Sequence, residues 1–200
     1  MLTIMKNIIL ASQSPRRKQL LEQAELSFTI RTAHSDEDFP PGMAPEEVPL
    51  FIARNKARAV ADTLSPQERS AALIIAADTV VLLDGKIIGK PADEADAAAI
   101  LGVLSGRMHR VVTGVTMWTS EGERSFSEVT EVYFGTLSPE QIRHYVSRYR
   151  PLDKAGAYAI QEWIGLAGIR KINGDFYNVM GLPVSRVLQE LQEMTAGAVL

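Results

Sequence analysis

The stretch LIIAADTVVLL, residues 73–83, decides the fold, because it reads as a central strand whose apolar run is interrupted by one carboxylate, Asp78. A turn at Asp84-Gly85 comes next, and residues 86–88 then return as a short strand. The centre of the predicted sheet therefore lies at residues 73–83.

Upstream of this strand the chain reads as strand, helix and strand. Residues 7–11 (NIILA) have the apolar character of a buried strand, and residues 12–15 (SQSP) supply helix-start chemistry, with Pro15 suited to the first helical position. Residues 27–32 alternate like a second strand, and residues 45–64 are expected to form the next helix. A crossover connection is therefore predicted at the start of the chain.

Downstream, helices alternate with strands joined by turns. The sequence predicts a helix at 93–104, strands at 109–118 and 126–134 joined by a hairpin at 120–123, a capped helix opening at 138–141, and a closing helix at 183–194. Residues 153–161 are rich in small side chains, and Gly165 and Gly168 are expected to interrupt regular structure in this part of the chain.

These two kinds of connection define the predicted fold class. A chain with both crossovers and hairpins is poorly suited to a purely parallel sheet. We therefore predict an α/β protein with one elongated mixed β-sheet flanked by helices, organised as a single domain over residues 1–200.

Composition excludes several classes of protein. The net charge of −3 leaves no overall basic field to hold a nucleic acid or an anionic membrane, and the absence of cysteine removes disulfides, thiolate metal sites and cysteine nucleophiles. The longest apolar stretches fall well short of the roughly 20 residues that span a bilayer, and the N-terminus does not read as a signal peptide. We expect a cytoplasmic protein with no nucleic-acid and no membrane partner.

The segment SQSPRR, residues 12–17, is a candidate anion site. It comes after a strand and opens a helix, so hydroxyls, free backbone N–H groups and two guanidiniums converge, which is what a triphosphate requires. The alternative is an ordinary helix cap beside two solvated arginines.

Asp78 is a second candidate, because an unpaired carboxylate inside an apolar strand is costly to bury. A divalent cation, a lysine or an activated water would compensate it, whereas the alternative is an aspartate that caps a loop. The acidic triplet 36–38 (DED) adds oxygen ligands of the kind that Mg²⁺ or Mn²⁺ prefers, although such triplets are usually solvated loops.

Other catalytic motifs are either spaced wrongly or absent from the sequence. In GKIIGK, residues 85–90, the glycines lie one residue too close for a phosphate-binding P-loop, and Pro91 stands where Ser or Thr is required. The three histidines are scattered, and neither HExxH nor GxSxG occurs. Walker-type, metalloprotease and serine-hydrolase classes are therefore disfavoured.

Several strings, taken together and in order, resemble the Maf family of nucleoside triphosphate pyrophosphatases over residues 7–190. They are LASQSPRR (10–17), NKA (55–57), ADTVV (77–81), GKP (89–91), LSG (104–106) with His109, VTGV (112–115), DKAGAYAIQ (153–161) and GLP (181–183). The resemblance implies the fold shared by Maf proteins and inosine triphosphatases, with two lobes around a cleft. It also implies a protein that is often a homodimer and that hydrolyses a nucleotide to its monophosphate and pyrophosphate.

The resemblance also implies roles for individual residues. Asp78 matches the proton acceptor, and Arg16, Thr79 and Gln161 stand at positions associated with base selection. Glu37 falls near an acidic position which, with Asp78, is associated with the metal. The positions associated with phosphate contact are matched by Ser12, Arg17, Lys56 and Lys90.

The form of residues 153–161 resembles the subgroup that acts on dTTP and UTP rather than the one that acts on 7-methylguanosine triphosphate. The chain departs from many relatives at residues 162–165 (EWIG), where they have a glycine-rich turn, so the rim of the pocket is expected to differ. Trp163 there is read as a packing residue rather than as a base-stacking one.

Two functions remain as alternatives to the enzyme. One is a nucleotide-binding regulator of cell division in which hydrolysis is incidental, although a pure binder would not need Asp78. The other is a scaffold whose basic loop binds any polyanion.

Overall fold

The computed structural model describes residues 7–196, and side chains over residues 7–194. The strands are β1 (Asn7–Leu10), β2 (Phe28–Ile30), β3 (Ala72–Leu83), β4 (Lys86–Ile88), β5 (Met108–Thr119), β6 (Gly122–Phe134) and β7 (Ile169–Asn173). The helices are α1 (Pro15–Gln23), α2 (Val48–Ala61), α3 (Pro66–Ala71), α4 (Glu94–Leu104), α5 (Pro139–Tyr149), α6 (Trp163–Gly168), α7 (Phe176–Met180) and α8 (Val184–Ala196), with a 3₁₀ turn at Ala155–Ala157.

All seven strands within residues 7–196 belong to one mixed sheet, which confirms the predicted class. Its order is β2-β1-β3-β5-β6-β7, with β4 paired to β3. β2, β1 and β3 are parallel, because crossovers through α1 and α2 join them, whereas the hairpin partners β5 and β6 run antiparallel. Strands β3, β5 and β6 are 12, 12 and 13 residues long, which makes the sheet elongated.

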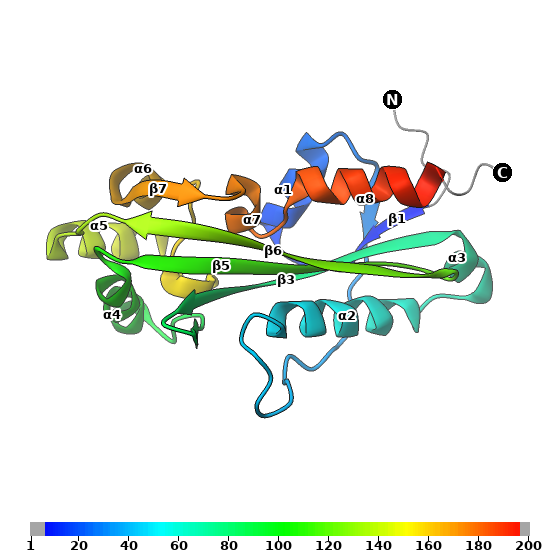
Figure 1. Cartoon of the computed structure of the whole chain (residues 1–200), viewed down its shortest axis with the longest axis horizontal. Helices are drawn as coiled ribbons and strands as arrows, with labels where there is room; N and C mark the ends of the chain where they lie inside the picture. The colour runs from blue at the N-terminus through cyan, green and yellow to red at the C-terminus, as the bar shows by residue number, and fades with distance from the viewer. Residues whose placement is uncertain (1–6, 197–200) are drawn as a thin grey trace.

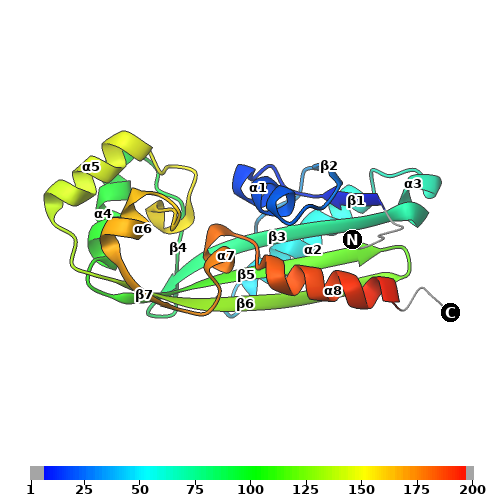
Figure 2. The ribbon, with the colours of Figure 1, turned by 90° about the horizontal axis from the view of Figure 1, so that it is seen from above.

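The helices cover both faces of the long strands. Helix α2 lies along one face, and α1, α7 and α8 lie along the other (Figure 1). Seen from above, α4, α5 and α6 gather at one end of the sheet, while α1, α2 and α8 lie along the rest of it, with α3 at the far end (Figure 2). The two groups form the two lobes that the resemblance implies.

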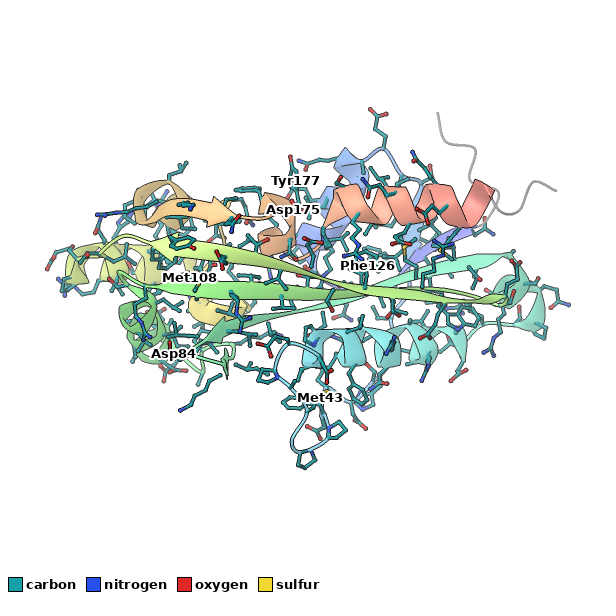
Figure 3. All side chains as sticks on the ribbon, in the orientation of Figure 1. Met43, Asp84, Met108, Phe126, Asp175 and Tyr177 are labelled. Carbon is teal, nitrogen blue, oxygen red and sulfur yellow. The ribbon has the colours of Figure 1, made fainter. Side chains whose placement is uncertain are left out.

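Residues on β3 alternate strictly between these two faces. Ile74, Ala76, Val80 and Leu82 pack with α2, while the larger core that includes α1, α4 and α8 takes Leu73, Ile75, Ala77, Val81 and Leu83. On that second side, Phe126 of β6 lies beneath α8 (Figure 3), with the Arg186 guanidinium 4.3 Å from the centre of its ring. Because β3 is covered on both faces, it reads as continuously apolar.

Gly114 on β5 lets α2 approach the sheet unusually closely. A methyl group at Gly114 would lie 2.3 Å from the backbone nitrogen of Leu50 in α2, a distance that no side chain tolerates. The glycine therefore sets the height of α2 above the sheet, and with it the position of every side chain that α2 points toward β3.

Several elements differ from the predictions. The structure adds α3, α6, α7 and β7, and Gly165, expected as a breaker, lies inside α6. β7 is a short edge strand with its charged residues exposed, so it lacks the apolar alternation of the inner strands. The hairpin is tighter than expected, since β5 ends at Thr119 and β6 begins at Gly122. None of the helices within residues 7–196 has the length and apolarity that crossing a bilayer requires.

The helix starts follow capping chemistry. Ser138 and Gln141 form the reciprocal capping box that opens α5, and Pro15 occupies the first turn of α1 as predicted. Asp175 caps α7 by accepting a hydrogen bond of 2.8 Å from the backbone N–H of Tyr177, and Gly181 ends that helix at φ 115°.

Candidate active site

The candidate site lies where one edge of β3 has no strand beside it. β1 pairs with residues 72–75 of β3 and β4 pairs with residues 81–83, so residues 76–80 have a described strand partner only on the β5 side. Asp78 and Thr79 lie in the middle of this gap, and they are the only two residues of β3 that are not fully buried.

Asp78 and Thr79 point to opposite faces of the sheet because they are neighbours on a strand. Asp78 faces α2, where it contacts Lys56, and Thr79 faces α1, where it contacts Arg17. A ligand that reaches both side chains must therefore pass around the open edge of β3.

A cavity of about 650 Å³ occupies this position, and all nine residues predicted for the site line it. They come from the loop before α1 and from α1 itself, from the acidic loop, from α2 and β3, and from the segments after β4 and after the 3₁₀ turn. In chain order they are Ser12, Arg16, Arg17, Glu37, Lys56, Asp78, Thr79, Lys90 and Gln161.

Lys56 joins two carboxylates on the α2 side of the cavity. Its Nζ lies 2.8 Å from Oδ1 of Asp78 and 2.7 Å from Oε1 of Glu37. The hydrogen bond from Lys56 holds the pKa of Glu37 below its usual value, against the opposing effect of burial. The compensation that the partly buried Asp78 requires is thus supplied by a lysine in this structure.

Arg17 organises the opposite side of the cavity. Its Nε donates to the carbonyl oxygen of Gly181 at 2.8 Å, Nη1 donates to Oγ of Ser12 at 3.1 Å, and Nη2 donates to Oγ1 of Thr79 at 3.1 Å. Burial lowers the pKa of the Arg17 guanidinium, and the negative charge of Asp78 opposes that shift. A guanidinium remains charged at neutral pH even so. Two of its five N–H groups are left for a ligand.

A second group of ion pairs also lines the cavity. Arg16 Nη1 donates to Oδ2 of Asp153 at 3.0 Å, and Nζ of the buried Lys154 lies 2.7 Å from Oδ1 of the same carboxylate. Burial acts to raise the pKa of Asp153, but the hydrogen bonds from Lys154 and Arg16 outweigh it and lower the pKa. Asp153 therefore holds two of the cations that line the cavity.

Three ring side chains pack together next to the 3₁₀ turn, and one of them, Tyr158, lines the cavity. The hydroxyl of Tyr158 lies 2.8 Å from Nε2 of His109, and the rings of His109, Phe134 and Tyr158 pack edge to face. His109 is 1% exposed, and burial lowers its pKa to about 4, so the imidazole is neutral at neutral pH.

The balance of charge favours an anionic ligand. Five lysine and arginine side chains line the cavity against three carboxylates, although the chain as a whole carries a net charge of −3. A local positive field is thus concentrated in one cavity of an acidic protein, where it attracts an anion.

The donor set also suits a hard divalent cation. The oxygens of Glu37 and Asp78 converge on one nitrogen of Lys56, and Mg²⁺ is usually held by one or two carboxylates together with substrate phosphates. Within the described part of the chain, no group of three or more His, Asp or Glu side chains is placed to hold a metal ion by itself. The two carboxylates would therefore need phosphate oxygens and water to complete a coordination sphere.

Some residues of the site were given no role by sequence reasoning. Thr113 and Tyr158 belong to the strings VTGV and DKAGAYAIQ, so their place in those motifs was the available signal. Asp153 and Lys154 begin the second string. Asn178, which is fully buried behind Thr113, had no signal in the sequence.

A mixed α/β fold with a cation-rich cavity at an open strand edge defines a class of protein that binds small anionic ligands. Residues 7–194 match a family model described as "Maf-like protein", and the chain belongs to the Maf family. This membership confirms the resemblance that the sequence motifs carry.

Curated relatives cover nearly the whole chain. The "dTTP/UTP pyrophosphatase" of Phocaeicola vulgatus is 50% identical over 188 residues, which are 94% of this chain and 95% of that protein. Proteins of the same name from Porphyromonas gingivalis and Cytophaga hutchinsonii are 50% and 49% identical, covering 93% and 94% of this chain and 93% and 84% of their own length. A solved structure, that of the Staphylococcus aureus Ham1 protein, superposes with a TM-score of 0.43 at 19% identity over 64% of this chain and 72% of that chain, which is too low to bear on the fold.

Proposed function

We propose that the chain is a nucleoside triphosphate pyrophosphatase that hydrolyses dTTP and UTP to the monophosphate and pyrophosphate. The observation that carries the chemistry is the cavity at the open edge of β3, where a carboxylate and five cationic side chains face one space. The substrates are those in the names of relatives that are 49–50% identical over almost the full chain.

In this reaction a water oxygen bonds to the α-phosphorus, and the bond from that phosphorus to the bridging oxygen breaks. The carboxylate of Asp78 accepts the proton of the attacking water, as a general base within reach of the cavity. Lys56 holds that carboxylate in place through its hydrogen bond of 2.8 Å. Pyrophosphate leaves with the electrons of the broken bond.

The basic side chains stabilise the charge that grows on the phosphates. Arg17, Lys56 and Lys90 line the cavity together with Ser12, and electrostatic stabilisation of this kind dominates most phosphoryl chemistry. Arg16, Thr79 and Gln161 would then contact the nucleoside.

A divalent cation, Mg²⁺ or Mn²⁺, would be held by Glu37 and Asp78. It would supply Lewis-acid polarisation of the phosphate oxygens. Lys56, which contacts both carboxylates, would share them with that ion, and the excess positive charge of the four groups would be offset by the substrate phosphates.

The test is release of pyrophosphate from dTTP, UTP, CTP, GTP and 7-methylguanosine triphosphate, with and without Mg²⁺ or Mn²⁺. We expect metal-dependent turnover of dTTP and UTP. In water labelled with oxygen-18, the label should enter the monophosphate and not the pyrophosphate, because attack is at the α-phosphorus. Label in the pyrophosphate would contradict the mechanism.

The same assay separates the alternatives. Binding of a nucleotide without turnover would favour the regulator of cell division, in which Asp78 only senses the ligand. Competition by inorganic triphosphate as strong as that by UTP, again without turnover, would favour a scaffold for polyanions.

A further inference from the structure

A chain of hydrogen bonds runs from the cavity into the interior of the sheet. Arg17 donates to Oγ1 of Thr79, which lies 2.9 Å from Oγ1 of its register partner Thr113 on β5. Thr113 in turn donates to the backbone carbonyl oxygen of Asn178 at 3.1 Å. Thr113 and Asn178 are both fully buried, so no bulk water can replace these partners.

The two ends of this chain determine its direction. A guanidinium can only donate and a carbonyl oxygen can only accept, while each hydroxyl has a single hydrogen. All three bonds form only if Thr79 donates to Thr113 and Thr113 donates to Asn178. In the reverse arrangement Thr113 would donate to Thr79, and its bond to the Asn178 carbonyl would be lost.

The inner end of the chain is firmly held. Nδ2 of Asn178 donates to the carbonyl oxygen of Val111 at 3.1 Å and to Oγ1 of Thr130 at 3.0 Å. Thr130 also bonds the backbone N–H and carbonyl of Asp175, both at 3.0 Å. Asp175 and Tyr177 thus begin α7 against β6 (Figure 3), and the carbonyl that Thr113 contacts has a fixed position.

The consequence is that Thr79 has no hydrogen to offer a ligand. Its hydroxyl lines the cavity, its hydrogen points inward to Thr113, and one lone pair remains after the bond from Arg17. A ligand atom that meets this hydroxyl must therefore donate a hydrogen bond. An ionised phosphate has no hydrogen, so the partner is part of the nucleoside.

We propose that Thr113 is a positioning residue for base selection, which acts by holding Thr79 as a hydrogen-bond acceptor. The group that Thr79 accepts from is the imide N3–H that uracil and thymine share. Cytosine has an acceptor at the same ring position, so it meets a lone pair and is disfavoured. This inference rests on the proposed function, because it assumes that a pyrimidine nucleotide occupies the cavity.

The experiment compares UTP with CTP in four proteins. These are the wild type, Thr113→Val, which keeps the branched shape but removes the hydroxyl, Thr113→Ser, which restores the hydroxyl, and Thr116→Val as a matched control. Thr116 is equally buried on β5, but its hydroxyl bonds Ser125 rather than the chain that reaches the cavity. The readouts are kcat/KM for both nucleotides and, without metal, the affinities of UMP and CMP by calorimetry.

In Thr113→Val the hydroxyl of Thr79 is free to turn its hydrogen toward the ligand. We expect the preference for UTP over CTP to fall by about tenfold, the worth of one hydrogen bond, with the affinities of UMP and CMP converging in parallel. Thr113→Ser should restore the preference, and Thr116→Val should leave it unchanged.

An unchanged preference in folded Thr113→Val would overturn the proposal, and so would an equal loss on UTP and CTP, which indicates a sugar hydroxyl or general damage. If Thr113→Val does not fold, Thr113→Ala removes the same hydroxyl together with the γ-methyl group and adds nothing in their place, and the same criteria apply. A wild type that turns over neither UTP nor dTTP would instead refute the proposed function. The two failures are therefore distinguishable.

Discussion

Asp78 on β3 and Gly114 on β5 are register partners, and the glycine is the point at which the backbone of α2 touches the sheet. The candidate base and the helix that carries Lys56 are therefore brought together by the absence of a side chain at one position. This relationship makes the site sensitive to changes that touch no functional group.

Gly114→Ala should destabilise the protein although alanine normally suits a strand better than glycine. The added methyl group would overlap the backbone of Leu50, so α2 must move, at a cost of about 3 kcal/mol in unfolding free energy. Urea denaturation measures the loss. The control is Gly102→Ala in α4, where the methyl group meets nothing within 4 Å and should stabilise by about 0.5–1 kcal/mol. Equal stabilities for the two variants would contradict the close approach.

Asp78→Asn should abolish most turnover and leave the fold intact. Removal of a general base typically costs about 10²–10⁴ in rate, and Lys56 retains its second partner, Glu37. The measurement is kcat on UTP, with the melting temperature as a check of folding. Asp84→Asn, outside the cavity and paired with Arg107, is the matched control. Turnover within twofold of wild type in Asp78→Asn would remove Asp78 from its role.

Glu37→Gln should raise the concentration of Mg²⁺ or Mn²⁺ needed for half-maximal rate. The amide keeps the shape of the side chain but loses the negative charge that a divalent ion favours. At saturating metal the rate should approach that of the wild type, because Asp78 is unchanged. Asp36→Asn in the same loop, where His34 is the partner, serves as control. An identical metal requirement in both variants would argue against Glu37 as a ligand.

Arg17→Lys should be poorly tolerated although the positive charge is retained. Lysine cannot reproduce the planar fork that bonds Gly181, Ser12 and Thr79 at once. We expect a higher KM for UTP and a loss of about 2 kcal/mol in unfolding free energy from the buried acceptors left without partners. Arg143→Lys, an exposed change at a residue paired with Glu140, should alter neither quantity.

His109 should make the protein less stable in mild acid. Its pKa is lowered to about 4 in the folded state by burial, against about 6.5 in an unfolded chain. Between these values the unfolded state takes up a proton that the folded state does not, so stability falls as the pH drops from 6.5 toward 4, by about 3 kcal/mol in total. Urea midpoints at pH 7, 5.5 and 4.5 test this. In His109→Gln the fall should shrink by most of that amount, whereas His34→Gln, at an exposed position, should behave as wild type.

The sequence predicts much of this fold because its long strands and capped helices carry local signals. The apolar run at 73–83 marks β3, and the Ser-Pro-Glu-Gln segment marks the start of α5. The four missed elements are short. α3 does carry a local signal, the capping box of Ser65 and Glu68, whereas other missed elements depend on distant neighbours. α7, for example, is held by a bond between Thr130 and Asp175, residues that lie 45 positions apart.

Part of the candidate site could likewise be predicted from local sequence signals, and part could not. The sequence predicts nine site residues, and all nine line the cavity, but it does not reveal that Asp78 and Thr79 face opposite sides of the sheet around an open edge. Nor does it reveal the link from Thr113 to Asn178, because that link joins residues 65 positions apart through a buried carbonyl. Such relationships arise from strand pairing and packing, which no local pattern records.

The gap in strand pairing at residues 76–80 also bears on aggregation through strand edges. An uncovered strand edge is a template onto which another chain can add and begin to aggregate. Here Arg17 and Lys56 bond the two side chains in the middle of that edge, from opposite faces, so an incoming strand would have to bury charged groups to dock. Arg17 and Lys56, which we propose bind phosphate, would thus also oppose the addition of a strand at this edge. Neutral replacements at both positions should increase aggregation as well as reduce activity.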